Sequence, residues 1–382
     1  MRILILGGDG YLGWPTAMNL AAHGHEIIVA DNYLRRSLCR ETSSEPLFEV
    51  PNLQDRAVHW FERTGQKISV AIGNLADWTF AAGVFEQFLP EAVIHYAEQP
   101  SGPYSMMNRG AAATTLNNNL GTTFNVIFAV KEFCPDCHII KLGTMGEYGT
   151  PNIDIEEGWL DIKHKGREGR FLFPRQAGSL YHTTKIMDTD LLWFYVRNWG
   201  LRVTDLMQGP VYGMETEESG VDQRLMPFFN YDEIFGTVLN RFVVQAVAGF
   251  PLTVYGAGGQ TRGFLNIKDT LSCVKLAALT PPDKGQLRIF NQFTEVFSVN
   301  DLASHVQRAG RLLGYDVMIK SIANPRQELE EHYYNPAHTG LLELGLEPHL
   351  LTDNVLAGML ETVARNADRI DQRKFLRGVK WA

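Results

Sequence analysis

The stretch YHTTK carries a tyrosine and a lysine four residues apart, Tyr181 and Lys185. On a helix this spacing places both side chains on one face. The pKa of a free tyrosine is about 10, so the phenol is a poor base at neutral pH unless a nearby positive charge stabilises its phenolate. Tyr181 next to a lysine ammonium is therefore a candidate general base. Because Y-x-x-x-K also occurs by chance on helices, its meaning depends on the surrounding elements.

A second stretch, KLGTMGEYGT, begins in a buried apolar run and ends in polar residues, among them Thr144 and Glu147. The tyrosine–lysine pattern becomes specific when a Ser or Thr follows the fifth strand of a dinucleotide-binding fold, and Thr144 occupies that place. Glu147 is the acid of this stretch and a candidate catalytic carboxylate. His182, beside Tyr181, is another candidate because an imidazole titrates near neutral pH.

Short aliphatic runs alternate with helical patterns through the first half of the chain, which is typical of a parallel βαβ sheet. From about residue 210 the pattern breaks into pieces punctuated by glycine and proline. The sequence therefore predicts an α/β fold: a Rossmann-type doubly wound parallel sheet with a smaller C-terminal substrate-binding lobe. The predicted strands are residues 2–6, 25–31, 68–73, 92–97, 138–143, 201–207 and 287–293.

The predicted domain boundary lies between residues 209 and 210. We expect the dinucleotide-binding domain over 1–209 and the substrate-binding lobe mainly over 210–382, with parts of 240–295 returning to the sheet. Residues 34–60 are predicted to be irregular, since they are charged and longer than most βα connections. Residues 150–180 are predicted to form an extended loop or a small hairpin.

The run LILGGDGYLG places three glycines directly after the first predicted strand. A tight strand-to-helix turn needs glycine there, and the free N–H groups of the following helix can bind a pyrophosphate. The second strand ends at Asp31, whose carboxylate would accept hydrogen bonds from the adenosine ribose and repel a 2′-phosphate, which favours NAD over NADP. Two arginines that follow argue the other way, since a guanidinium can accept a 2′-phosphate. The predicted cofactor contacts are Gly7, Gly10, Tyr11, Leu12, Gly13, Asp31, Asn32, Arg35, Arg36, Asn74, Leu75, Tyr96, Asn119, Tyr181, Lys185 and Gln208.

Composition limits the class of protein. The chain has 382 residues, 45% of them hydrophobic, and a formal net charge of −8. This length allows a large core, and the acidic balance argues against a nucleic-acid-binding protein. No run is long enough to span a membrane, which predicts a soluble, cytoplasmic protein, or one of the plastid stroma if a transit peptide has been removed. Cys134 and Cys137 form one C-x-x-C without a second ligand pair, so we expect a helix-to-strand turn and no metal.

The glycine turn, Asp31, Thr144 and the tyrosine–lysine pair together resemble an extended short-chain dehydrogenase/reductase of the nucleotide-sugar type. Further motifs spread over nearly the whole chain narrow this resemblance to the UDP-sulfoquinovose synthase family. They are GGDGYLGW, EQPSGPYSMMNR, KLGTMGEYGTPNIDIEEG, YHTTK, VYGMETEE, FGTVLNRF, PLTVYGAGGQTRGFLNIKD, FNQFTEVFSVNDLA and NPRQELEEHYYN.

The resemblance implies a reaction in which tightly held NAD oxidises C4 of UDP-glucose, water is lost across C5–C6, sulfite adds at C6 and the hydride returns to C4. In this scheme Tyr181 removes the proton of the C4 hydroxyl and Thr144 orients that hydroxyl. Lys185 lowers the pKa of Tyr181 and holds the nicotinamide ribose. UDP-glucose and sulfite, or a protein that donates sulfite, are thus the implied partners.

The elimination step needs a further acid and base. Related sugar 4,6-dehydratases carry Thr-Asp-Glu before Val-Tyr-Gly, which places Met145 and Gly146 where their Asp and Glu stand. Glu147 falls one position later and would point to the opposite face of an extended strand unless the chain turns at Gly146. Glu147 and His182 therefore remain competing candidates, and His182 could instead be a capping or packing residue near a helix start.

The two phosphates of a UDP-sugar call for arginine side chains. Arg262 and Arg326 match the phosphate-binding positions of the extended family, and Gln208 matches a substrate amide position. The predicted substrate contacts are Gln99, Tyr104, Thr144, Gln208, Thr253, Arg262, Arg326 and Tyr334.

One position departs from the family pattern, which usually reads Glu-Gln-Arg-Ser-Ala-Pro-Tyr where this chain has EQPSGPY. Pro100 thus replaces an arginine near the sugar and sulfite, which puts in doubt the use of sulfite or the way it is held. The alternatives are a nucleotide-sugar 4-epimerase or 4,6-dehydratase, or an enzyme that uses another nucleotide sugar or adds another nucleophile. A non-catalytic NAD-binding regulator is an alternative of a different class, against which the intact Thr144, Tyr181 and Lys185 argue.

Enzymes of this type usually dimerise through two helices. Here those helices correspond to the apolar-rich stretches 111–133 and 181–199. We therefore expect a homodimer, and neither a nucleic-acid nor a membrane partner.

Overall fold

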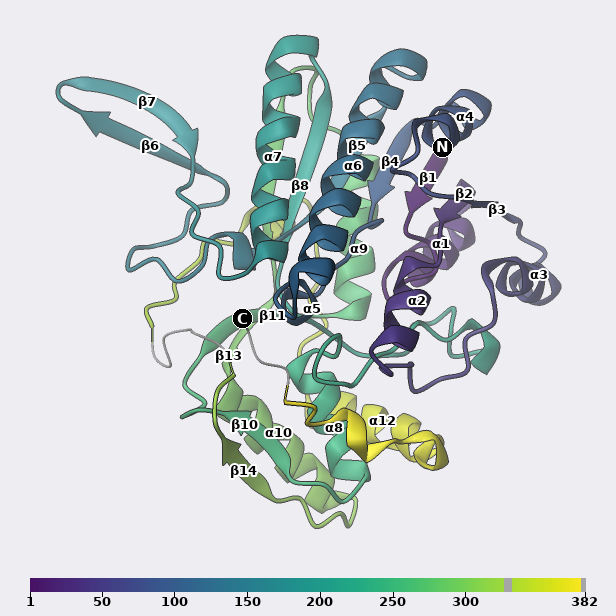
Figure 1. Cartoon of the computed structure of the whole chain (residues 1–382), viewed down its shortest axis with the longest axis vertical. Helices are drawn as coiled ribbons and strands as arrows, with labels where there is room; N and C mark the ends of the chain where they lie inside the picture. Colours follow the sequence, from purple (N-terminus) through teal and green to yellow (C-terminus); the bar gives the residue numbers. More distant parts are fainter. Residues whose placement is uncertain (326–331, 379–382) are drawn as a thin grey trace.

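The computed structural model describes residues 1–325 and 332–378 (Figure 1). Seven strands, all parallel to their neighbours, form one sheet in the order β12-β8-β5-β4-β1-β2-β3. The order runs outward from β1 in both directions, which is the doubly wound arrangement that the sequence predicts. The strands are β1 (Arg2–Leu6), β2 (Glu26–Asp31), β3 (Ile68–Ile72), β4 (Ala92–His95), β5 (His138–Thr144), β8 (Arg202–Gln208) and β12 (Leu287–Gln292).

Helices cover both faces of this sheet. One face carries α4 (Trp78–Phe88), α6 (Arg109–Phe133) and α7 (Leu180–Trp199). The other carries α1 (Gly13–Ala22) and α9 (Ile267–Leu279). Leu4 and Leu6 of β1 pack into the first core, whereas Ile3 and Ile5 pack into the second, because alternate residues of a strand point to opposite sides. Burial on both faces explains why the strands read as continuous aliphatic runs.

The segment predicted to be irregular, residues 34–60, is largely helical, so that prediction is wrong. It forms α2 (Leu34–Glu41) and most of α3 (Leu53–Thr64). Asn52 caps α3 by accepting a hydrogen bond from the Asp55 amide, and only Leu53, Arg56 and Trp60 are buried on its inner face. The high charge of the outer face hides this helical spacing in the sequence.

The insertion at 150–180 contains a hairpin that projects from the body of the molecule (Figure 1). Strands β6 (Trp159–His164) and β7 (Arg167–Leu172) pair antiparallel. Lys165 and Gly166 between them both have positive φ, 49° and 76°, which is the two-residue turn that suits a tight hairpin. The hairpin that the sequence predicts is therefore present.

The smaller lobe is built mainly from residues after β8. Its helices are α8 (Val238–Val247), α10 (Val299–Leu312) and α12 (Asp353–Ala364), whereas α11 (Gly340–Glu343) packs against β12 of the main sheet. Its strands are β9 (Val211–Tyr212), β10 (Leu252–Tyr255), β11 (Thr261–Asn266), β13 (Glu295–Ser298) and β14 (Ile319–Ile322). The core between α8, α10 and α12 also takes in Leu47 and Phe48 from the first half of the chain. In return, α9 and β12 lie against or within the main sheet, so the chain crosses between the lobes several times.

Three further findings bear on function. In residues 1–325 and 332–378 no helix is long and apolar enough to cross a membrane. The same residues contain no cluster of three or more His, Cys, Asp or Glu side chains able to hold a metal ion. Cys134 and Cys137 stand at the turn between α6 and β5, where the sequence places them.

Candidate active site

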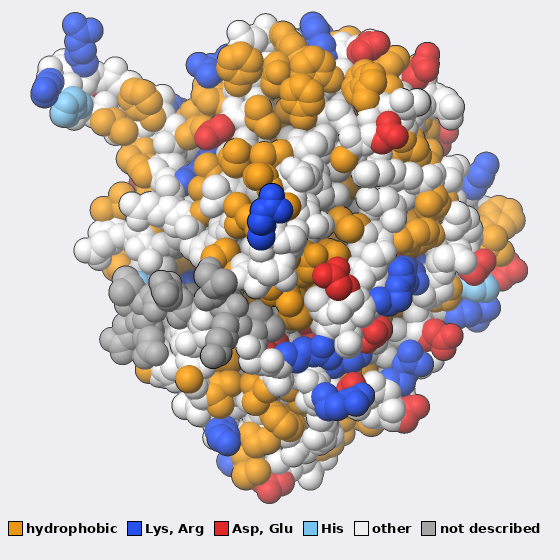
Figure 2. Space-filling view, in the orientation of Figure 1, with side chains coloured by type: hydrophobic (Ala, Val, Ile, Leu, Met, Phe, Trp, Pro, Cys, Tyr) orange, Lys and Arg blue, Asp and Glu red, His pale blue; other side chains and the backbone are white. Residues whose placement is uncertain are grey.

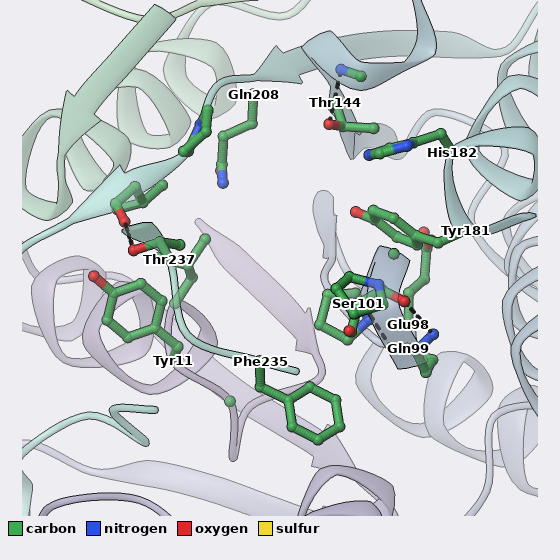
Figure 3. Close-up of a pocket in the computed structure, with 18 of the residues that line it drawn as sticks. Tyr11, Glu98, Gln99, Ser101, Thr144, Tyr181, His182, Gln208, Phe235 and Thr237 are labelled. Carbon is green, nitrogen blue, oxygen red and sulfur yellow. Dashed lines mark hydrogen bonds between the residues drawn. The ribbon is translucent and has the colours of Figure 1, made fainter. Parts of the chain in front are cut away.

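A cavity of about 900 Å³ lies between the carboxyl ends of the sheet strands and the smaller lobe (Figure 3). Its walls come from the segments that follow β1, β2, β3, β4, β5 and β8, and from the α8, β10 and β11 regions of the smaller lobe. Ligands of doubly wound folds bind at this edge of the sheet, because the loops after the parallel strands converge there.

The glycine turn after β1 fits a dinucleotide. Gly7 has φ 84°, and a Cβ there would lie 2.7 Å from the Tyr96 carbonyl oxygen. A Cβ on Gly13 would lie 2.1 Å from the Gly7 carbonyl oxygen, so both positions require glycine. The N-cap of α1 is Leu12, whose side chain cannot accept a hydrogen bond. The first N–H groups of α1 are therefore available to a pyrophosphate.

Asp31 lies where the sequence predicts the ribose carboxylate. It accepts hydrogen bonds from the backbone amides of Asp9, at 2.9 Å, and Tyr33, at 2.6 Å, and it lines the cavity. Burial, together with the Asp9 carboxylate, raises the pKa of Asp31 to about 6. Gly10, Tyr11, Asn32, Leu75 and Tyr96 line the same cavity.

The two arginines after β2, Arg35 and Arg36, differ in their hydrogen-bond partners and in whether they line the cavity. The Arg36 guanidinium is bound to both Asp9 carboxylate oxygens, at 2.6 and 2.8 Å, so it is not free to accept a 2′-phosphate. Arg35 lines the cavity with its guanidinium 3.9 Å above the Phe235 ring, and the Asn230 side-chain oxygen accepts its hydrogen bonds. Arg36 does not line the cavity that the described residues form, so its contact with the cofactor stays a prediction.

The reaction end of the cavity brings three predicted residues together: Thr144, Tyr181 and His182 (Figure 3). The Tyr181 hydroxyl points into the open space beside the other two. Burial raises the pKa of Tyr181 well above its usual value, as do the Glu98 and Glu147 carboxylates, whereas Lys141 lowers it. The phenol thus needs further positive charge in the cavity before it can act as a base near neutral pH.

Lys185 is four residues from Tyr181 on α7, as the sequence predicts, but its ammonium does not line the cavity in the described part of the chain. It lies 2.5 Å from the Glu98 carboxylate and 3.8 Å from that of Asp188. Burial lowers the pKa of Lys185, but the two carboxylates outweigh burial and the pKa is raised overall. Glu98, which does line the cavity, therefore separates Lys185 from the ligand space.

Glu147 is fully buried and does not face the cavity that the described residues form. The chain does turn after Thr144, in a 3-10 turn over Met145–Glu147, but the turn directs the carboxylate into the protein. One carboxylate oxygen accepts hydrogen bonds from the Lys141 ammonium, at 3.2 Å, and from the Thr144 amide, at 3.3 Å. Glu147 therefore fixes the turn that presents Thr144, and its candidacy as the elimination acid is not supported.

His182 occupies the space of a missing side chain. A Cβ on Gly146 would lie 2.4 Å from the His182 Nε2. The Nδ1 atom lies 3.0 Å from the Ser179 hydroxyl, which holds the ring in place. The imidazole therefore stands where a side chain at position 146 would project.

Several predicted contacts do not reach the cavity. Tyr104 stacks on Phe235 and Thr253 pairs with Gln245, so both are packing residues. Asn119 bonds to the Gln99 backbone and the Thr184 hydroxyl, and it shapes the loop after β4 from behind. Arg326 lies outside the described residues. Asn74 also lies away from the cavity wall of the described chain, whereas the substrate candidates Gln99, Gln208, Arg262 and Tyr334 line it.

Sequence reasoning missed three charged residues of the cavity wall, Glu98, Glu233 and Arg241. Glu98 follows β4 at the active edge of the sheet, and that position was the available signal. Four of the five neighbours of Arg241 in LNRFVV are apolar, and a charge on the buried side of a helix was its signal.

Comparison with known proteins adds sequence and structural relatives. Residues 3–291 match the NAD dependent epimerase/dehydratase family. The chain is 48% identical over 380 residues to the chloroplastic UDP-sulfoquinovose synthase of Spinacia oleracea, covering all of this chain and 79% of that protein. The chain is also 43% identical over 384 residues to the UDP-sulfoquinovose synthase of Sulfolobus acidocaldarius, covering all of this chain and 98% of that protein. The UDP-glucose 4-epimerase of Bifidobacterium longum, solved with NAD+ and UDP, superposes with a TM-score of 0.72 at 20% identity, over 97% of this chain and all of that one.

Proposed function

The chain belongs to the NAD dependent epimerase/dehydratase family and, within it, to the UDP-sulfoquinovose synthases; from this premise we propose that it converts UDP-glucose and sulfite into UDP-sulfoquinovose. The observation that carries the proposal is the cavity that gathers Thr144, Tyr181 and His182 at one end and Arg262 in the lobe that faces them. A sugar reacting at C4 to C6 fits the first group, and its diphosphate fits the second.

The glycine turn, the start of α1 and Asp31 would hold the pyrophosphate and adenosine ribose of NAD. When bound, NAD supplies the acceptor and donor for the hydride at C4. The turn that Glu147 braces presents the Thr144 hydroxyl to the C4 hydroxyl of the sugar. Tyr181 then takes the proton from that hydroxyl and returns it when C4 is reduced.

His182 carries the proton at the C5–C6 end of the sugar. In the elimination, the C5–H and C6–O bonds break, a C5–C6 double bond forms, and the C6 oxygen leaves as water with one proton. When sulfite adds, a C6–S bond forms and a proton returns to C5. His182 supports both steps because its ring stands where the dehydratase carboxylate would project from position 146 and is held by Ser179.

The cavity wall that would contact sulfite lacks the arginine that is usual in the family. Pro100 lines the cavity at the position where the family usually has arginine, so the loop after β4 offers no guanidinium to the anion. Gln99 and Ser101, on either side of Pro100, are hydrogen-bonded to each other. The Gln99 side-chain oxygen accepts a hydrogen bond from the Ser101 amide at 2.5 Å. We therefore expect this chain to bind sulfite more weakly than relatives that keep the arginine.

A homodimer would cover an apolar surface on α6 and α7. Phe124, Met187 and Phe194 on these helices are 44%, 40% and 49% exposed. Hydrophobic side chains gather over the upper ends of the two helices in Figure 2. Exposed apolar surface of this kind is typical of subunit interfaces. Sedimentation of the protein with and without a Phe194→Glu substitution tests this: the account expects a dimer that the charge dissociates.

The proposed reaction is tested by incubating the purified chain with UDP-glucose, with and without sulfite, and identifying the products by mass spectrometry. The proposal expects a sulfonated nucleotide sugar that forms only with sulfite. UDP-galactose or a 4-keto-6-deoxy sugar, formed regardless of sulfite, would replace the proposal with an epimerase or a dehydratase. A chain that holds NAD but leaves UDP-glucose unchanged would fit the non-catalytic regulator.

A further inference from the structure

Glu98 and Lys185 form a buried ion pair beside Tyr181. The Lys185 ammonium lies 2.5 Å from one Glu98 carboxylate oxygen, and the side chains of Lys185 and Glu98 are 3% and 5% exposed. Glu98 lines the cavity, on the same wall as Tyr181 in Figure 3, whereas Lys185 does not line it within the described part of the chain. Because Tyr181 and Lys185 are one helical turn apart on α7, the charges of this pair act directly on the phenol.

The loop after β4 fixes the Glu98 carboxylate in this position. The amide of the next residue, Gln99, donates a hydrogen bond to the buried Asn119 side-chain oxygen at 2.8 Å. The His95 Nε2 lies 3.8 Å from the Glu98 oxygen that contacts Lys185. Burial lowers the pKa of His95 to about 4, so this imidazole is neutral at neutral pH and does not offset the Glu98 charge. Lys185 is therefore the cation that pairs with Glu98.

The other ionisable groups around the phenol do not supply a second unpaired cation. Those that face Tyr181 are Lys141 of β5, Glu147 of the turn after it, and His182 and Asp188 of α7. Lys141 lies between two carboxylates, 3.2 Å from Glu147 and 3.1 Å from Asp205. Within residues 1–325 and 332–378, each lysine ammonium near the phenol is thus held by at least one carboxylate.

We propose that Glu98 is a positioning residue for the reaction: it holds the Lys185 ammonium out of the cavity and offsets its charge at the Tyr181 phenol. The inference rests on the proposed function, which makes Tyr181 the base and then the acid at C4. Bound NAD supplies a nicotinamide ring that is positive when oxidised and neutral when reduced. With Lys185 offset by Glu98, the protonation of Tyr181 follows that difference in charge. This suits a phenol that must take a proton in the oxidation and give it back in the reduction.

Stability alone does not account for the pair. Replacing a buried ion pair by apolar side chains is often neutral or stabilising, so burial of two charges needs another reason. The second Glu98 carboxylate oxygen is buried without a hydrogen-bond donor among the described residues, which a pair kept only for stability would not leave unpaired. Its place at the cavity wall, next to the phenol, is the reason that the geometry offers.

The test measures the ionisation of Tyr181 itself, in the NAD-loaded protein without nucleotide sugar. NMR of isotope-labelled tyrosine Cζ reports it across a pH titration, and Tyr181→Phe identifies the signal. Glu98→Gln takes away the anion that offsets Lys185, so Tyr181 should lose its proton about 1 to 2 pH units lower than in the parent. Lys185→Met leaves the Glu98 carboxylate alone and should move the titration to higher pH. The double variant removes both charges and should titrate close to the parent.

Two controls separate this role from a general effect of charge or of packing. Glu98→Asp keeps the carboxylate and should stay closer to the parent than Glu98→Gln does. Glu233→Gln removes a different carboxylate of the cavity wall, one that accepts hydrogen bonds from the Tyr255 hydroxyl and the Arg377 amide, and it should titrate like the parent. The acid limb of the pH profile of C4 oxidation should move to lower pH in Glu98→Gln by the same amount as the NMR titration.

Several results would overturn the assignment. They are a Tyr181 titration in Glu98→Gln equal to that of the parent, an equal shift in Glu233→Gln, and a double variant that keeps the whole shift of Glu98→Gln. A rate of C4 oxidation that falls at every pH while the limb stays in place would make Glu98 a structural residue. If Glu98→Gln does not fold, the double variant, which leaves neither charge alone, must titrate at lower pH than Lys185→Met. A protein that forms no sulfonated sugar refutes the proposed function, but the Tyr181 titration still decides the role of Glu98.

Discussion

Substitution of Glu147 separates a structural role from a catalytic one. In the structure this carboxylate is fully buried, 3.2 Å from the Lys141 ammonium, and it also accepts the Thr144 amide. Lys141 keeps three other contacts, to the Asp205 carboxylate at 3.1 Å, the Lys185 carbonyl at 2.9 Å and the Thr189 hydroxyl at 2.6 Å. Glu147 and Asp205 therefore both balance the buried Lys141 ammonium, and the second Glu147 oxygen also lies 3.7 Å from the Arg175 guanidinium.

The expected cost follows from those contacts. Glu147→Ala leaves Lys141 with Asp205 as its one remaining carboxylate and removes the acceptor of the Thr144 amide, and loss of a buried ionic partner costs about 3 to 5 kcal/mol of unfolding free energy. Glu147→Gln keeps an oxygen for both donors and leaves Lys141 balanced by Asp205. Its cost should be that of weakened charge-assisted hydrogen bonds, about 1 to 2 kcal/mol.

Denaturant unfolding measures these costs, and two labelled substrates measure the chemistry. UDP-glucose deuterated at C4 reports oxidation, and UDP-glucose deuterated at C5 reports the loss of the C5 proton to water. Because Glu147 holds the Thr144 turn, Glu147→Gln should slow both reactions by a similar factor. A variant that is as stable as the parent, oxidises C4 at the parent rate and no longer exchanges the C5 label would refute this reasoning, since Glu147 would then be the elimination catalyst.

Four further predictions concern the cavity wall. Tyr181→Phe should suppress the formation of NADH during turnover by at least about 100-fold, as expected for loss of a general base, and absorbance at the nicotinamide band measures it. His182→Gln should retain C4 oxidation but lose C5 exchange about 100-fold, which the two deuterated substrates distinguish. The pKa of Asp31 is raised to about 6, so its carboxylate takes up a proton as the pH falls through that value, and the affinity for NAD should weaken below about pH 6. Calorimetry across about pH 5 to 8 measures this affinity, and its pH dependence should vanish in Asp31→Asn. Pro100→Arg restores the cation usual in the family and should lower the KM for sulfite about tenfold with little change in the KM for UDP-glucose, whereas an unchanged sulfite KM would mean that the anion is held elsewhere.

The sheet could be predicted because parallel strands that are buried on both faces read as unbroken aliphatic runs. All seven runs form its strands. The tyrosine–lysine pair and the glycine turn could also be predicted from the sequence, since each depends on local geometry alone. By contrast, α3 was missed because its buried positions, Leu53, Arg56 and Trp60, are separated by charged residues and one of them is itself an arginine.

The residues that were misplaced depend on three-dimensional packing. Whether Glu147 faces the ligand depends on the 3-10 turn after β5 and on Lys141, which lies six residues earlier on a strand that reads as apolar. The contact between Lys185 and Glu98 joins residues 87 positions apart, and no local pattern signals it. The space left by Gly146 is filled by His182, from another element of the fold. Such pairings are set by the fold and are not visible in local spacing.

The central claim, transient oxidation at C4 coupled to sulfonation at C6, is tested most directly by one tracer experiment. The purified protein is given UDP-glucose deuterated at C4, together with sulfite, and the product is examined by mass spectrometry and by NMR at C4 and C6. The account predicts a single product that carries sulfur at C6 and retains the deuterium at C4, because the hydride that leaves C4 returns to it. A product without sulfur, or a sulfonated product that has lost the C4 deuterium, would contradict the account.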